Sequence, residues 1–416
     1  MSEIHIALQE IQSGNTDKGL EILQRQLVKA GDEEKYEIAQ MYQQLGLLHE
    51  ANDVFQQLME TYPDESELKL HIAEIYTDLD DDEKALEYLN EIDEEDENYL
   101  HALVQAADLY QAQGLYEVAE QKLLQAKRLA PSEPVLDFAL GELAYSTGEY
   151  QKAIPYYEKA LKQQNTYGEI EVQQRLAECL ASIGHLTEAM DYFQKVEKKS
   201  PDDMFRYGFT AFQGNRMDIA IHVWEKLLDK DSSYYSVYPL LTKAYEEEGL
   251  PDKAYDTVRK GLNQDEYNKE MYFLAGKIAN KLGNREEAIE YVREAISLDP
   301  GYKEAIMFLV ESFKEHEEYE KITDLLTNVL DLGETDPVYY WELARANYEL
   351  EEYDKALNNY EEAYNGFTND IEFLKEYGYI LVEEGRLAKA KEVFQRYLAI
   401  EPSDTEMEEY VQRLER

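Results

Sequence analysis

A pattern repeated about every 34 residues constrains this chain more than any other feature of its sequence. It is clearest in residues 100–133, LHALVQAADLYQAQGLYEVAEQKLLQAKRLAPSE. Apolar residues recur there at steps of three and four in two separate segments, which predicts two helices. Gly114 lies between the segments, where freedom to adopt positive φ lets the chain reverse, and Pro131 ends the second helix. We therefore expect each repeat to form a helical hairpin.

Copies of this pattern follow one another along the whole chain, with two interruptions of the spacing. The spacing slips at residues 163–168 and again at 198–203, and a further complete unit follows each slip at once. We expect a local change of superhelical pitch or a hinge at these places, rather than a linker between independent domains. The predicted units occupy residues 1–31, 32–65, 66–99, 100–133, 134–169, 170–200, 201–234, 235–268, 269–302, 303–336, 337–370 and 371–404.

The residues at the fixed positions of this pattern resemble those of the tetratricopeptide repeat. That family has a large-small pair, Tyr, Gly, an aromatic residue, Ala, a large apolar residue, Ala and Pro at set places. The resemblance covers essentially the whole chain, and in style it extends to the soluble tetratricopeptide proteins of Bacillus-type bacteria. It implies an all-α, right-handed α-solenoid superhelix of about twelve helix-turn-helix units with one continuous core. In residues 100–133 it is carried by Ala106, Ala107, Tyr110, Gly114, Tyr116, Ala119, Leu123, Ala126 and Pro131.

Residues 405–416, TEMEEYVQRLER, lie outside the predicted units. Met407, Tyr410, Val411 and Leu414 form one apolar stripe on an otherwise charged segment. Repeat arrays need such a helix to cover the apolar face of the last unit. We therefore predict that residues 405–416 form a capping helix.

The charge and cysteine content restrict the partners and the compartment that we expect. The chain has 41 basic and 89 acidic residues, for a net charge of −48, which opposes binding to nucleic-acid phosphates and to anionic lipid surfaces. The single cysteine, Cys179, is expected to be a small buried residue, and its lack of a partner cysteine fits a reducing compartment. Without an apolar run of membrane-spanning length or a basic leader, we expect a cytoplasmic protein with neither nucleic-acid binding nor membrane insertion.

No pattern in the sequence is typical of catalysis or of cofactor binding. A phosphate-binding loop and a nucleophile elbow are both missing. The seven His residues are scattered, with no pair at a metal-binding spacing. We therefore expect no enzymatic activity, no metal and no small-molecule cofactor.

The resemblance implies that the first helix of each unit lines a concave groove. Ligand contacts would come mainly from positions two, five, six, nine, twelve and thirteen of the unit. At these positions cations and aromatic residues alternate, which suits a peptide segment with apolar and acidic anchors. The predicted groove residues are Arg175, Phe205, Arg206, Phe209, Phe212, Lys243, Phe273, Lys277, Lys281, Lys314, Trp341, Arg345 and Tyr348.

An alternative interpretation of the same residues is purely structural. The cations would offset neighbouring acids such as Glu246, Glu311 and Glu342, and some aromatic side chains would pack between helices. The family's clamp for peptide C-termini is not matched, since Lys277 and Asn280 lack the further Lys and Asn residues that it requires.

Two functions fit this sequence. The first is an adaptor or scaffold that binds a partner segment in its groove. The second is a regulator whose superhelix changes pitch when a peptide binds, with the irregular residues 163–203 as the flexing point. Regulators of that class usually carry an effector module, and the repeats here begin almost at Met1.

Overall fold

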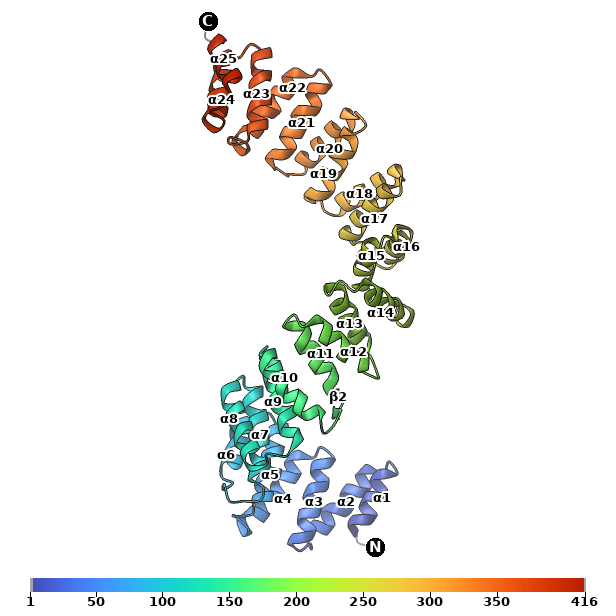
Figure 1. Ribbon diagram of the computed structural model, residues 1–416. Helices are drawn as coiled ribbons and strands as arrows, with labels where there is room; N and C mark the ends of the chain where they lie inside the picture. Colours follow the sequence, from blue (N-terminus) through green and yellow to red (C-terminus); the bar gives the residue numbers. More distant parts are fainter. Residues whose placement is uncertain (1–2, 415–416) are drawn as a thin grey trace. The chain divides into compact units, whose positions relative to one another are not determined.

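The computed structural model describes residues 3–414, and these residues confirm an all-α solenoid of helix-turn-helix repeats (Figure 1). They form 25 α-helices, one short 3-10 helix and one two-stranded sheet. Contacts between the helices divide the chain into an N-terminal unit, Met1–Gly214, and a C-terminal unit, Asn215–Arg416. The division lies in the turn after α13 and coincides with neither of the two interruptions of the repeat spacing.

In the N-terminal unit the helices follow one another as successive pairs. Their bounds are α1 Glu3–Gln12, α2 Thr16–Leu27, α3 Asp32–Gln44, α4 Leu48–Thr61, α5 Ser66–Asp78, α6 Asp82–Asn90, α7 Tyr99–Ala112, α8 Tyr116–Leu129, α9 Pro134–Ser146, α10 Tyr150–Leu161, α11 Val172–Ser182, α12 Leu186–Lys195 and α13 Pro201–Gln213.

The C-terminal unit continues in the same way. Its helices are α14 Met217–Lys230, α15 Val237–Glu247, α16 Pro251–Leu262, α17 Lys269–Lys281, α18 Arg285–Leu298, α19 Lys303–Lys314, α20 Tyr319–Asp331, α21 Pro337–Glu349, α22 Tyr353–Ala363, the 3-10 helix η1 Tyr364–Gly366, α23 Ile371–Glu383, α24 Leu387–Ile400 and α25 Thr405–Arg413.

Every hairpin turns through a residue with positive φ. At Gly114, φ is 74°, the Gly114 amide donates to the carbonyl of Gln111, and the Leu115 amide donates to that of Tyr110. This is the Schellman arrangement, which satisfies carbonyls at the end of the first helix. Four hairpins use a residue other than glycine, at Asp80, Asn215, Glu317 and Glu351. The turn therefore keeps its left-handed backbone conformation even in the hairpins that have no glycine at this position.

Side chains of equivalent helices in neighbouring repeats are hydrogen-bonded at a spacing of 31 to 35 residues. Gln43 donates to Glu74 at 2.8 Å, and Tyr145 donates to Glu178 at 2.7 Å. Since the repeat is about 34 residues long, these bonds join corresponding faces of successive hairpins. Within the N-terminal unit, and likewise within the C-terminal unit, the first helices of successive repeats thus share one face, called the first-helix face below, and their side chains meet in rows.

The first interruption of the spacing contains a β-hairpin that the sequence did not predict. Strands β1 Thr166–Tyr167 and β2 Ile170–Glu171 pair antiparallel, directly before α11. The ring of Tyr167 stacks on Phe138, with centroids 4.5 Å apart, and so holds the hairpin against α9. At the second interruption Ser200 and Asp203 form a capping box that starts α13.

Helix α25 packs its apolar stripe against the preceding hairpin. Met407 is 3% exposed and Val411 6%, and both belong to the same cluster as Phe394 and Tyr397 of α24. Asp404 begins the helix by accepting the Met407 amide and the Tyr397 hydroxyl. Burial of this stripe shields the outer surface of α24 from water.

Deleting residues 405–416 should make the protein self-associate, because Phe394 and Tyr397 would become part of an exposed apolar face. Sedimentation velocity over a range of concentrations measures this directly. Exchange of the exposed Glu406 and Glu409 for alanine is the control, since it leaves the buried stripe intact. A truncated chain that remained monomeric and equally stable would contradict the capping role of α25.

Candidate functional site

Position nine of one repeat lies beside position six of the next on the first-helix face, 31 residues further along the chain. In the C-terminal unit Arg345 occupies position nine, and its Nη2 lies 2.7 Å from Oε1 of Glu376 at position six of the next repeat. In the N-terminal unit Gln40 meets His71 at the same spacing. For a cation at position nine, position six of the next repeat is therefore one place that can supply an acidic partner.

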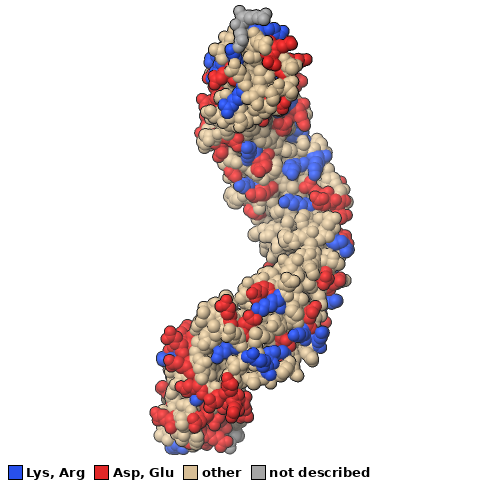
Figure 2. Space-filling view, turned by 60° about the vertical axis from the view of Figure 1, so that its left-hand side comes forward, with Lys and Arg blue, Asp and Glu red and all other residues tan. Residues whose placement is uncertain are grey.

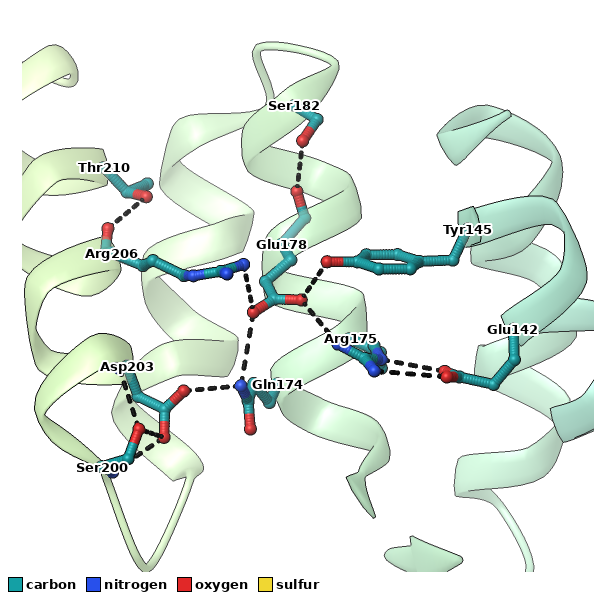
Figure 3. Close-up of polar contacts among 10 residues, drawn as sticks. All are labelled: Glu142, Tyr145, Gln174, Arg175, Glu178, Ser182, Ser200, Asp203, Arg206 and Thr210. Carbon is teal, nitrogen blue, oxygen red and sulfur yellow. Dashed lines mark hydrogen bonds and ion pairs between the residues drawn. The ribbon is translucent and has the colours of Figure 1, made fainter. Parts of the chain in front are cut away.

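Arg175 and Arg206 both find acidic partners in the N-terminal unit (Figure 3). Arg175 Nε is 2.9 Å from Glu142 Oε1, and its Nη1 is 3.2 Å from Glu178 Oε2. Arg206 Nη1 is 2.8 Å from the other oxygen of Glu178, and the Arg175 guanidinium lies 4.5 Å from the centroid of the Tyr145 ring. These five residues, Glu142, Tyr145, Arg175, Glu178 and Arg206, form the Glu178 cluster.

Burial and nearby charge shift pKa values within the Glu178 cluster, in opposite directions for Arg175 and in the same direction for Tyr145. Glu178 is only 5% exposed. Burial alone would lower the pKa of Arg175, but the hydrogen bond to Glu142 and the charge of Glu178 raise it overall. Burial and the hydrogen bond to Glu178 raise the pKa of Tyr145 to about 12. The cluster is therefore a satisfied ionic network that fixes α9, α11 and α13 relative to one another.

Cys179 is buried beside this cluster, as the sequence analysis expected. Burial, together with the nearby charge of Glu178, raises the pKa of its thiol to about 12. The thiol therefore stays protonated at neutral pH and is a poor nucleophile.

Three predicted aromatic residues lie on α13. The Phe205 and Phe209 rings stack with centroids 6.2 Å apart and an angle of 12° between their planes. Phe209 is 37% exposed, while Phe205 and Phe212 are half-buried. The end of the N-terminal unit thus presents an aromatic edge.

Three of the five predicted cations of the C-terminal unit are also ion-paired. Lys281 Nζ is 2.5 Å from Glu246, and Lys314 Nζ is 3.1 Å from both Glu311 and Glu342. Arg345 contacts Glu342, Glu372 and Glu376 at 3.1, 2.6 and 2.7 Å. The alternative interpretation, in which cations offset neighbouring glutamates, therefore describes these three residues as well as Arg175 and Arg206.

The predicted aromatic residues of the C-terminal unit are packed to different degrees. Trp341 is 7% exposed and lies under the Arg345 guanidinium, whose central carbon is 4.1 Å from the ring centroid. Phe273 is half-buried and meets the ring of Tyr302 at 5.2 Å. Tyr348 is half-buried and donates to Glu383 at 3.0 Å, which raises the pKa of the Tyr348 hydroxyl. Trp341 is therefore an internal support rather than a surface anchor.

Lys243 and Lys277 differ from the other predicted cations. Both are exposed at position nine of successive repeats, on α15 and α17, and neither forms an ion pair within residues 3–414. The 31-residue spacing is consistent with the difference, since the partner positions hold Leu274 and Phe308 instead of an acid. Lys277 instead lies over the Phe273 ring, with Nζ 5.7 Å from the centroid.

Sequence analysis missed an acidic cavity on the first-helix face of the C-terminal unit. The cavity has a volume of about 560 Å³ and is lined by five carboxylates and two cations, together with tyrosines from four helices. A search for opposite charges 31 residues apart would have found Glu376 as the partner of Arg345. The lining residues that are not among the predicted groove residues include Tyr319, Glu349, Tyr360, Glu372, Glu376, Tyr379 and Glu383.

The surface is acidic overall, as the composition requires. Figure 2 shows acidic side chains gathered at the end of the molecule that carries the N-terminus, over the first hairpins. Within residues 3–414 no group of His, Cys, Asp and Glu has the geometry to hold a metal ion. No helix among these residues is both long and apolar enough to cross a bilayer.

Comparisons with known proteins agree on the repeat type. Models of YpiA-like tetratricopeptide repeats match residues 111–166, and models of YpiA-like C-terminal tetratricopeptide repeats match residues 337–404. General tetratricopeptide-repeat models match residues 144–208 and 269–302.

A full-length relative is the TPR repeat-containing protein YpiA of Bacillus subtilis. It is 40% identical over 414 residues, which cover 99% of this chain and 98% of the relative. Among solved structures, YrrB, described as a TPR protein with an unusual peptide-binding site, is 18% identical with a TM-score of 0.40, covering 44% of this chain and 96% of that one. The Cut9–Hcn1 complex of APC/C gives a TM-score of 0.32 at 14% identity, covering 99% of this chain and 95% of that one.

Proposed function

This chain belongs to the YpiA-like family of tetratricopeptide repeat proteins, and we propose from this premise that it is a non-catalytic cytoplasmic scaffold or adaptor that binds a peptide segment of a partner protein. Proteins built from these repeats are in general protein-interaction scaffolds. The proposed binding surface is the first-helix face of the C-terminal unit. The segment that binds there has apolar and acidic anchors.

The observation that carries this proposal is the pair of unpartnered lysines at equivalent positions. Lys243 and Lys277 lie at equivalent positions on α15 and α17, and both are exposed and form no ion pair within residues 3–414. The chain has a net charge of −48, so most of its surface repels the carboxylates of a ligand. Two exposed lysines at equivalent positions of successive repeats attract such carboxylates locally. The half-buried Phe273 beside Lys277 adds apolar contact area for the same segment.

Exchange of Lys243 and Lys277 for glutamate should abolish capture of the partner, because the ligand carboxylates would face like charges. Wild type and the Lys243→Glu/Lys277→Glu variant are compared by quantitative affinity capture from cell lysate, with circular dichroism to confirm that both fold. Lys281 is left in place, since its exchange would also break the ion pair with Glu246.

The matched control is Lys226→Glu/Lys260→Glu, which makes the same change of charge on the exposed surfaces of α14 and α16. A photo-crosslinking amino acid at position 277 should label the partner, whereas one at position 260 should not. Equal capture by both double variants, with labelling from position 260, would place binding on the second helices and contradict the proposal.

A further inference from the structure

We propose that the cavity between α19 and α23 binds an arginine side chain of the partner protein. The inference rests on the proposed function, since it names one anchor of the segment bound on the first-helix face. The cavity is open to that face and, at about 560 Å³, is within the range of ligand-binding pockets. Its lining residues come from α19 to α23, all within the C-terminal unit.

The charge of the lining favours a cation. Five carboxylates, Glu342, Glu349, Glu372, Glu376 and Glu383, line the cavity with two cations, Lys314 and Arg345. Both cations are already held by carboxylates of the protein, at distances of 2.6 to 3.1 Å. An anionic ligand would therefore meet net negative charge, and both cations already have carboxylate partners within the protein.

Two of the carboxylates retain capacity to bind a ligand. Glu349 is exposed and forms no ion pair or hydrogen bond within residues 3–414. Glu383 accepts one hydrogen bond, from the Tyr348 hydroxyl at 3.0 Å. Tyr348 and Tyr379 also line this cavity, so its wall carries aromatic rings as well as these two carboxylates. This combination recognises cations by charge-assisted hydrogen bonds and by cation–π contact.

The protein already holds guanidinium groups with the same combination of side chains. Arg345 lies 4.1 Å from the centroid of Trp341 and is bound by Glu342, Glu372 and Glu376. In the N-terminal unit, Arg175 lies over an aromatic ring and contacts two glutamates (Figure 3). Tyr348 and Tyr379 line the cavity together with carboxylates, but no Lys or Arg of residues 3–414 lies over either of these two rings. A planar guanidinium can donate several hydrogen bonds to carboxylate oxygens while it stacks on an aromatic ring, which an ammonium cannot do, so this combination favours arginine over lysine.

The test uses fluorescence anisotropy with labelled heptapeptides of sequence Gly-Ser-Leu-X-Leu-Ser-Gly on the full-length chain. X is arginine, its uncharged isostere citrulline, or glutamate. The arginine peptide is expected to bind about tenfold more tightly than the citrulline peptide, as for a charged hydrogen-bonding pair. The glutamate peptide should bind more weakly still. Equal affinity for arginine and citrulline peptides would overturn the proposal.

Two variants then locate the site. Glu349→Gln/Glu383→Gln should abolish the preference for arginine while leaving the fold intact, since neither residue is ion-paired. Glu286→Gln/Glu290→Gln on α18 makes the same change of net charge at exposed positions outside the cavity and should retain the preference. Loss of the preference in both variants would show a general charge effect and overturn the assignment to this cavity.

The arginine peptide contains no carboxylate side chain, so its binding separates this inference from the proposed function. Lys243→Glu/Lys277→Glu should still prefer the arginine peptide even though it fails to capture the partner. A retained arginine preference together with unchanged partner capture by that lysine variant would support the cavity and contradict the lysine row. If the lysine variant loses the partner and wild type shows no preference for the arginine peptide, the lysine row is supported and the cavity assignment is contradicted.

Discussion

Exchange of Glu178 for alanine should lower the free energy of unfolding of the N-terminal unit by about 3 kcal/mol, the cost of removing one member of a buried ion pair. Glu178 is 5% exposed and receives bonds from Arg175, Arg206 and Tyr145. The exchange leaves these three groups without their shared acceptor, and the desolvation of Arg175 is then offset only by its ion pair with Glu142. This loss outweighs the entropy that the freed side chains regain.

Hydrogen exchange read by mass spectrometry suits this measurement, because a repeat array opens in parts rather than all at once. Peptides from α11 and α13 should exchange faster in Glu178→Ala, and the urea midpoint by circular dichroism should fall. Glu158→Ala is the control, since Glu158 lies exposed on α10 without an ion pair in the described chain. Protection of α11 equal to that of the control variant would show that the Glu178 cluster contributes little stability.

Much of the fold followed from the sequence because the repeat encodes each hairpin locally. The steps of three and four residues in 100–133 predict helices, and α7 and α8 occupy this segment, with a positive φ at Gly114 between them. Glu317 stands where the repeat pattern places the turn glycine, and it adopts φ of 57° there. In the turn between α13 and α14 the sequence offers both Gly214 and Asn215, and Asn215 takes the positive φ, at 56°. Asparagine tolerates this conformation better than most residues, so either assignment was open from sequence.

The binding surface was less predictable, because a list of cations says nothing of their partners. Position within the repeat places Arg345 and Lys277 on the same face. Arg345 contacts Glu376, 31 residues further along the chain, whereas the residue 31 positions after Lys277 is Phe308. The difference lies 31 residues away in the sequence, in a different repeat. The cavity around Glu383 depends on such relations across three hairpins, and the pattern of a single unit does not contain them.

Exchange of Gly276 for leucine should lower the free energy of unfolding of the C-terminal unit by about 1 to 3 kcal/mol, the usual cost of overpacking a close contact. A Cβ atom at Gly276 would lie 2.4 Å from Cγ2 of Val292 and 3.1 Å from the carbonyl oxygen of Ala288. Helices α17 and α18 would have to separate to accept it. The better helix propensity of leucine recovers about 1 kcal/mol at most, so the net effect is destabilising.

Trp224 and Trp341 are the only tryptophans and both belong to the C-terminal unit, so tryptophan fluorescence during urea unfolding reports on this unit. Gly276→Leu is made both in wild type and in a Val292→Ala variant, which lacks the atom nearest to the added Cβ. If the clash is the cause, Gly276→Leu should cost less in that background than in wild type, a coupling that a double-mutant cycle measures. An equal cost in both backgrounds would mean that the backbone of Ala288, rather than the Val292 side chain, sets the approach of the two helices. No cost in either would mean that α17 and α18 move apart without loss, and that the small residue at this position is not needed for their packing.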